Sequence, residues 1–144
     1  MKHPLLRLFL AALLVAGLTP PRAGASVAVA RSSAEKFIEV IEEGGPTFEE
    51  IGQGTLARGE SAVLRTTLYK GNSYTIVAAG CEEATDVDVA IYDEELNLVR
   101  KDETRDRLAS LEGIAPRYTG TFYIKVTMYE SASEGAHYVV LLGN

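Results

Sequence analysis

Short segments in which apolar and polar residues strictly alternate are the feature that most constrains the fold of this chain. Residues 86–92 alternate, with Val87, Val89 and Ile91 on one face. Residues 121–129 alternate more clearly still, with one face formed by Phe122, Ile124, Val126 and Met128. A period of two places alternate side chains on opposite faces of a β-strand, so both segments predict half-buried strands.

Turn-forming residues separate several further extended segments. These segments are residues 55–58, 61–69, 73–79, 98–100, 109–114 and 137–142. Residues 70–72 predict a tight hairpin turn between 61–69 and 73–79, and residues 93–97 predict a turn after Tyr92. Roughly seven or eight short strands at regular turn spacing predict an all-β, antiparallel, jelly-roll-like sandwich.

The first 25 residues have the order of a secretory signal peptide. A basic start precedes an apolar run over residues 8–18, and Pro20-Pro21 and a small-x-small site at Ala23–Ala25 follow it. We expect cleavage before Ser26 and a secreted or periplasmic protein, although a second small-x-small site, residues 28–30, could shift the cut. The apolar run is shorter than the ~20 residues of a spanning helix, which favours a cleaved signal peptide over an uncleaved anchor, the alternative. No membrane span is expected after cleavage.

Residues 32–43 predict a short N-terminal helix. Ser32 and Glu35 fit a capping box, and an apolar stripe follows, formed by Phe37, Ile38, Val40 and Ile41. This helix either covers one end of the domain or docks on a partner. The expected division is a signal peptide (1–25), a helix and linker (26–53), and a β-sandwich domain (54–144).

The charge of the mature chain excludes two classes of partner. Removing Lys2, Arg7 and Arg22 from 14 basic residues leaves 11 against 20 acidic residues, a net charge of −9. Such a surface repels phosphate backbones and anionic lipid headgroups, so nucleic acid and membrane surfaces are poor partners.

Carboxylates around residues 86–93 suggest a cation site. Asp86 and Asp88 share one strand face, Asp93 follows in the turn, and Ca²⁺ prefers several oxygen ligands of this kind. We therefore consider calcium as the one possible cofactor, with these three aspartates as its ligands. The alternative is that the acids form the solvated face of the strand.

Catalytic candidates are few. A small secreted hydrolase could use Asp86 and Asp88, or a dyad of Cys81 and His137. The acidic neighbours of Cys81 oppose a reactive thiolate, so a buried, inert thiol is favoured. No catalytic residue is therefore expected.

Exposed tyrosines suggest a partner surface. Tyr92, Tyr123 and Tyr129 lie on the polar faces of the expected strands, where they could contact a polymer or a protein. Cross-strand packing of the tyrosines is the alternative.

The order of these motifs resembles a known family. Residues 85–93 (TDVDVAIYD), residues 118–126 (YTGTFYIKV), the turn at 70–74 and the final YVV run follow the pattern of the bacterial pre-peptidase C-terminal domain. The resemblance covers residues 55–143 and implies a jelly-roll-like sandwich without catalytic activity, in secreted proteins. The family usually carries a glycine after the position of Asp93, where this chain has Glu94.

We therefore expect an exported, noncatalytic binding or accessory module. Its partner would be an extracellular or envelope protein or a polysaccharide, with calcium as a possible aid. The alternatives are the small hydrolase and a purely structural envelope protein.

Overall fold

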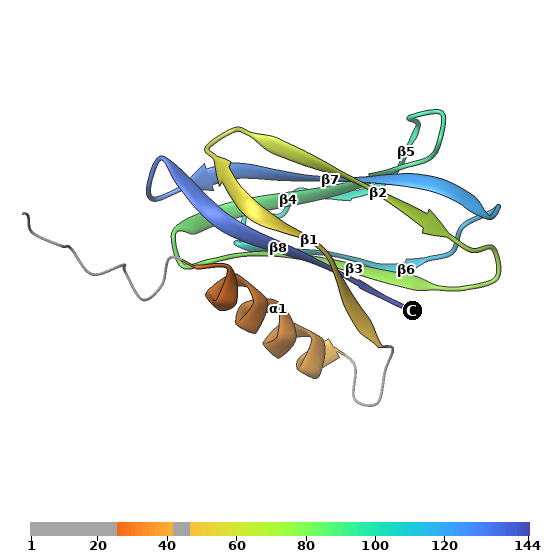
Figure 1. Cartoon of the computed structure of the whole chain (residues 1–144), viewed down its shortest axis with the longest axis horizontal. Coiled ribbons are helices and arrows are strands. Elements are labelled where there is room, and N and C mark those ends of the chain that lie inside the picture. The colour runs from red at the N-terminus through yellow and green to blue at the C-terminus, as the bar shows by residue number, and fades with distance from the viewer. Residues whose placement is uncertain (1–25, 42–46) are drawn as a thin grey trace, which may run out of the picture.

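The structure is a computed structural model that describes residues 26–41 and 47–144. In these ranges the chain forms one helix and eight strands (Figure 1). The elements are α1 (Val27–Ile41), β1 (Phe48–Ala57), β2 (Ser61–Leu68), β3 (Tyr74–Gly80), β4 (Ala84–Tyr92), β5 (Leu98–Asp102), β6 (Leu108–Ile114), β7 (Gly120–Ser131) and β8 (Gly135–Gly143). No helix within the described ranges has the length and apolar content to cross a bilayer.

The strands form two four-stranded antiparallel sheets. The first sheet has the order β1-β8-β3-β6, and the second has the order β2-β7-β4-β5. β1 pairs with β8, β2 with β7, β3 with β6 and β4 with β5. These are the pairs of one long antiparallel hairpin whose turn lies between β4 and β5, folded over into two sheets. This is a jelly-roll order. The predicted all-β, antiparallel sandwich with a short N-terminal helix is therefore confirmed.

The core lies between the two sheets, where the alternating segments predicted it. Val87, Val89 and Ile91 of β4 are buried. Their neighbours on β7 are the buried residues Phe122, Ile124, Val126 and Met128. Apart from the buried Asp86, the opposite faces of both strands are partly buried or exposed, because no described helix covers the outside of the second sheet.

The central strands of the first sheet, β3 and β8, are buried on both faces along most of their length. Every residue of β3 is buried, because β3 lies between the second sheet and α1 (Figure 1). α1 contacts β3 and β8 through Ala30 and Ala34, which are fully buried. Their small side chains allow the helix to approach the strands closely, and Phe37 and Ile38 extend the contact. Of the two expectations for the helix, the structure supports packing on its own domain.

The helix begins earlier than predicted. It starts at Val27, and the hydroxyl of Ser26 accepts a hydrogen bond from the Val29 amide at 3.2 Å. Ser26 is therefore the N-cap, and the capping box predicted at Ser32 is wrong, because Ser32 lies inside the helix and is exposed. Val40, assigned to the apolar stripe, is 82% exposed. The predicted end at residue 43 lies outside the described residues.

Strand β1 is longer than the predicted short strand at 55–58. It begins at Phe48, so residues 48–53, expected to be linker, pair with β8. The glycines that suggested a linker have a packing role instead. A Cβ atom on Gly52 would lie 2.6 Å from Leu64 Cδ1 of the second sheet, so glycine allows the two sheets to approach closely here.

The turn at residues 70–72 is tight, but it does not form the predicted hairpin. Gly71 adopts a φ of 96°, and the Asn72 amide donates to the Tyr69 carbonyl at 3.2 Å. However, β2 belongs to the second sheet and β3 to the first. The turn therefore carries the chain from one sheet to the other, which local sequence cannot distinguish from a hairpin.

Candidate functional site

A pair of tyrosines lies on the outer face of the second sheet, which no described helix covers (Figure 1). Tyr92 on β4 and Tyr123 on β7 occupy directly opposite positions in the ladder, and both are partly buried. Neither hydroxyl has a hydrogen-bond partner among the described residues. Tyr129 is 55% exposed and lies about 20 Å further along β7, at ~3.3 Å per residue. The structure thus brings together two of the three predicted surface tyrosines.

Two lysines lie beside the tyrosine pair. Ala90 of β4 pairs with Lys125 of β7 on one side and with Lys101 of β5 on the other. Their Cα atoms are about 10 Å apart, two strand spacings. Lys101 Nζ lies 2.6 Å from Glu103 Oε2, whereas Lys125 makes no ion pair or hydrogen bond with another described residue. Sequence reasoning missed these lysines, because only the strand register places them on either side of Ala90.

An acidic hollow lies along the same face, toward the start of β4. It has a volume of about 340 Å³ and is lined by Asp86, Asp88, Glu103, Arg105 and Tyr129. A neighbouring hollow of about 320 Å³ is lined by Thr85, Asp86, Arg105 and Glu130. Asp86 and Arg105 therefore border both hollows. The pairing of β4 with β7 shifts register on each side of Asp86, which marks an irregularity in the ladder.

Asp86 is buried and poorly satisfied. Its side chain is 7% exposed, and its Oδ1 atom has no hydrogen-bond partner among the described residues. Its Oδ2 atom lies 3.9 Å from Nε of Arg105. Burial raises the pKa of the Asp86 carboxyl above its ordinary value, and the nearby Arg105 only partly offsets this rise.

Asp88 is held in a similar electrostatic environment. Burial raises its pKa, and the adjacent negative charge of Asp86 raises it further, followed by Glu103 and Asp102. Lys101 opposes these effects. The two aspartates predicted to share a strand face therefore interact, and the charge of Asp86 disfavours ionisation of Asp88.

Asp93 is separated from the other two predicted calcium ligands. It follows the far end of β4, about 23 Å from Asp86 at ~3.3 Å per residue, so one ion cannot contact both. In the described part of the chain, no group of three or more His, Cys, Asp or Glu side chains could hold a metal ion. The predicted ligand set of three aspartates does not assemble.

Asp93 instead organises the β4–β5 turn. Its Oδ1 atom accepts hydrogen bonds from the Glu95 and Asn97 amides at 3.0 and 2.8 Å, and its Oδ2 atom accepts one from the Asn97 side chain at 3.0 Å. The hydrogen bond from the Asn97 side chain is the main cause of a lowered Asp93 pKa, and the bonds from the two backbone amides lower it further. Leu96 adopts a φ of 64°, a conformation that suits glycine better.

Cys81 and His137 are adjacent but form no dyad. The Cys81 amide donates to the His137 carbonyl at 3.0 Å, while the Cys81 thiol is fully buried. Nδ1 of the His137 ring is hydrogen-bonded to the Thr55 hydroxyl at 2.9 Å. These contacts support the expectation of an inert thiol.

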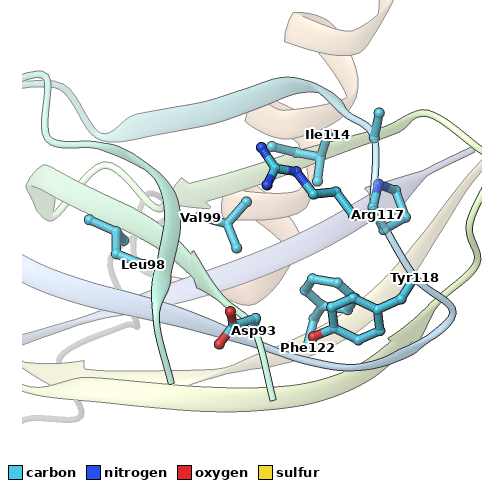
Figure 2. A pocket seen from close by; sticks show the side chains of 9 residues that line it. Asp93, Leu98, Val99, Ile114, Arg117, Tyr118 and Phe122 are labelled. Atoms are coloured by element: carbon cyan, nitrogen blue, oxygen red, sulfur yellow. The ribbon is translucent and has the colours of Figure 1, made fainter. Parts of the chain in front are cut away.

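An apolar pocket lies between the β4–β5 turn and the β6–β7 loop (Figure 2). Its volume is about 310 Å³, and its wall includes Tyr118 and Phe122, whose rings stack with centroids 5.1 Å apart. Leu98 and Val99, 50% and 47% exposed, lie at the opposite wall, and Arg117 extends between the walls. Sequence reasoning missed this pocket. Its one signal was the adjacent apolar pair Leu98 and Val99, which directly follows the predicted turn.

Comparisons with known proteins add information about the fold. No family model and no curated protein matches the chain. The pre-peptidase C-terminal domain of a collagenase from Bacillus anthracis has a TM-score of 0.51 and 15% identity, over 67% of this chain and 88% of that one. A periplasmic inhibitor of g-type lysozyme from Aeromonas hydrophila, PliG, has a TM-score of 0.44 and 11% identity, over 71% and 89%.

A third solved structure is a carbohydrate-binding module, CBM36, in complex with calcium and xylotriose. Its TM-score is 0.41, with 16% identity, over 67% of this chain and 97% of that one. Only the collagenase domain exceeds a TM-score of 0.5 among these three, and at this identity the likeness concerns the fold. The chain therefore has the fold of the pre-peptidase C-terminal domain, as the order of its sequence motifs predicted.

Proposed function

We propose that this chain is an exported, noncatalytic module that binds a polysaccharide on the outer face of its second sheet. The observation that carries the proposal is the uncovered pair of Tyr92 and Tyr123, whose hydroxyls have no partner among the described residues. A tyrosine offers an apolar ring and a polar hydroxyl, which suits the apolar and hydroxyl-bearing faces of a sugar.

A polysaccharide fits this face better than a protein does. The centre of a protein interface is typically rich in aromatic residues and depleted in lysine. Here Lys101 and Lys125 lie directly beside the tyrosine pair. Their ammonium groups can donate hydrogen bonds to the hydroxyl or carboxylate oxygens of a sugar. In the core of a protein interface, the same ammonium groups would have to lose their water.

The helix boundary supports export with cleavage before Ser26. Ser26 is the N-cap of α1, so a chain that begins there keeps the whole helix. Cleavage at the second small-x-small site, after Ala30, would remove a fully buried residue of the contact with β3 and β8. The proposed mature protein therefore begins at Ser26.

The experiment begins with the 144-residue chain, including residues 1–25, expressed in a bacterium. Protein recovered from the periplasm or medium is expected to have Ser26 at its N-terminus. It is then incubated with insoluble cellulose, xylan, chitin and peptidoglycan, and the bound fraction is measured. Retention on at least one polymer is expected. Tyr92→Ala and Tyr123→Ala should each weaken that retention about tenfold, as loss of an aromatic contact of ~1.4 kcal/mol implies.

Tyr69→Ala is the matched control. Tyr69 is 56% exposed and follows β2, outside the tyrosine pair, so its loss should leave retention unchanged. Equal retention of the Tyr92→Ala, Tyr123→Ala double variant would contradict the proposed face. Release of soluble sugar from a polymer would contradict a noncatalytic role.

A further inference from the structure

The Asp86 side chain is the least satisfied buried group in the described part of the chain. It is 7% exposed, and its Oδ1 atom is the one buried side-chain oxygen or nitrogen there without a hydrogen-bond partner. A carboxylate oxygen in this state costs stability unless something pairs with it. Asp86 also borders both hollows on this side of the second sheet, so a ligand in either hollow lies beside its side chain.

Around these hollows the carboxylates outnumber the cations. Glu103 pairs with Lys101 at 2.6 Å, and Glu130 lies 4.0 Å from Arg58. Asp88 makes no hydrogen bond or ion pair with another described residue. Arg105 is thus the one cation paired with Asp86, and the cation that acts on Asp88, Lys101, is already paired with Glu103.

Arg105 is a loose partner. Its side chain is 84% exposed, and its Nε atom lies 3.9 Å from Asp86, beyond hydrogen-bond distance. A pair in which the arginine is this exposed and lies beyond hydrogen-bond distance holds it only weakly, so another cation can displace it or bind beside it. The Tyr129 ring, 55% exposed, lines the same hollow and offers a face for a cation–π contact.

We infer that the Asp86 hollow binds a single guanidinium or ammonium group, presented by an arginine or lysine side chain of a partner protein. The surplus of negative charge favours a cationic group. A planar guanidinium can donate to Asp86 and Asp88 together, whereas no described carboxylate cluster has the geometry to hold a metal ion. This site is separate from the Tyr92–Tyr123 pair, so the inference goes beyond the proposed function and does not depend on it.

The test is an NMR titration of the ¹⁵N-labelled protein. The probes are N-acetyl-arginine amide, N-acetyl-lysine amide and N-acetyl-citrulline amide, which has nearly the shape of the arginine probe but no charge. Saturable shifts of the Asp86, Asp88 and Tyr129 amides are expected with arginine or lysine and not with citrulline. Asp86→Asn should weaken binding about tenfold or more, and Arg105→Gln should strengthen it up to about fivefold by removing the internal competitor.

Glu112→Gln is the matched control, because it removes one exposed negative charge from β6, in the other sheet. It should leave both the shifts and the affinity unchanged, and the amide spectrum of each variant reports whether it has folded. Three results would overturn the inference. These are no saturable shift in either the wild type or Arg105→Gln, equal shifts with citrulline, or tighter binding of Ca²⁺ or spermidine than of both charged amides.

Discussion

The Oδ2 atom of Asp102 accepts a hydrogen bond from the Ser110 amide at 3.0 Å, and this bond joins the edge strands of two different sheets. Close by, Arg100 donates to the Glu112 carbonyl at 2.5 Å. Charged residues of β5 thus satisfy backbone groups on the exposed edge of β6. An edge closed in this way cannot easily pair with a strand from another molecule.

Replacing Asp102 should open this edge. Asp102→Ala removes the acceptors of the Ser110 and Thr104 amides and should lower the free energy of unfolding by about 1–2 kcal/mol. Urea denaturation at pH 7 measures the change. Glu103→Ala, which removes only an exposed ion pair, should change stability by less than about 0.5 kcal/mol. An equal loss in both variants would show that the edge bond has no special role.

The loss of stability caused by Asp102→Ala should depend on pH. Burial alone would raise the Asp102 pKa, but the hydrogen bonds from Thr104 and Ser110 dominate and lower it below 3.8. The folded state thus binds this proton less tightly than the unfolded state. Its contribution to stability is present above pH 3.8 and is lost as the pH falls through the folded-state pKa, so the difference between wild type and Asp102→Ala should shrink there.

Asp86 should show the opposite pH dependence. Burial raises its pKa above 3.8, so the stability that it contributes is present below pH 3.8 and is lost as the pH rises through the folded-state pKa. Asp86→Asn removes this ionisation. It should raise the free energy of unfolding by about 1 kcal/mol at pH 7 and leave it almost unchanged near pH 3. Paired denaturation curves at both pH values test this.

Asp106→Asn serves as the comparison for Asp86→Asn. Asp106 is exposed, so its substitution should change stability by less than about 0.5 kcal/mol at either pH. A destabilised Asp86→Asn protein at pH 7 would mean that the carboxylate is well paired in solution.

Replacing Leu96 with glycine should stabilise the protein. Its φ of 64° is unfavourable for a residue with a Cβ atom, and its side chain is 67% exposed, so little burial would be lost. Leu96→Gly should raise the free energy of unfolding by about 0.5 kcal/mol, after the entropy cost of glycine in the unfolded chain. Leu96→Val should lower it, because β-branched residues tolerate positive φ poorly. Thermal unfolding of both variants checks the sign.

The close contact of α1 with the first sheet should not tolerate a larger side chain. Ala34 is fully buried, so Ala34→Leu should destabilise the protein by about 1–3 kcal/mol through overpacking. Hydrogen exchange of β3 and β8 amides would show whether α1 detaches. Val40→Leu, on the 82% exposed part of the same helix, should be nearly neutral.

The strands that alternate most strongly were predictable from the sequence, because only one of their faces is buried. Val87, Val89 and Ile91 point into the core as their spacing requires. β1 was less predictable, since its glycines indicate a linker locally and become strand residues only through pairing with β8. The buried Ala30 and Ala34 gave little signal, because alanine serves equally well on a buried or an exposed helix face.

The sequence by itself determined the local conformation of this chain: its strands, most of its turns, and the tyrosines and aspartates that are candidates for binding. Only the tertiary structure decided that β2 and β3 enter different sheets, that Tyr92 lies opposite Tyr123, and that the Asp86 carboxyl group is buried. The physical reason is that alternation and turn residues act over a few positions. Sheet membership, register and the burial of a charge depend on contacts between segments far apart in the chain, which no local pattern records.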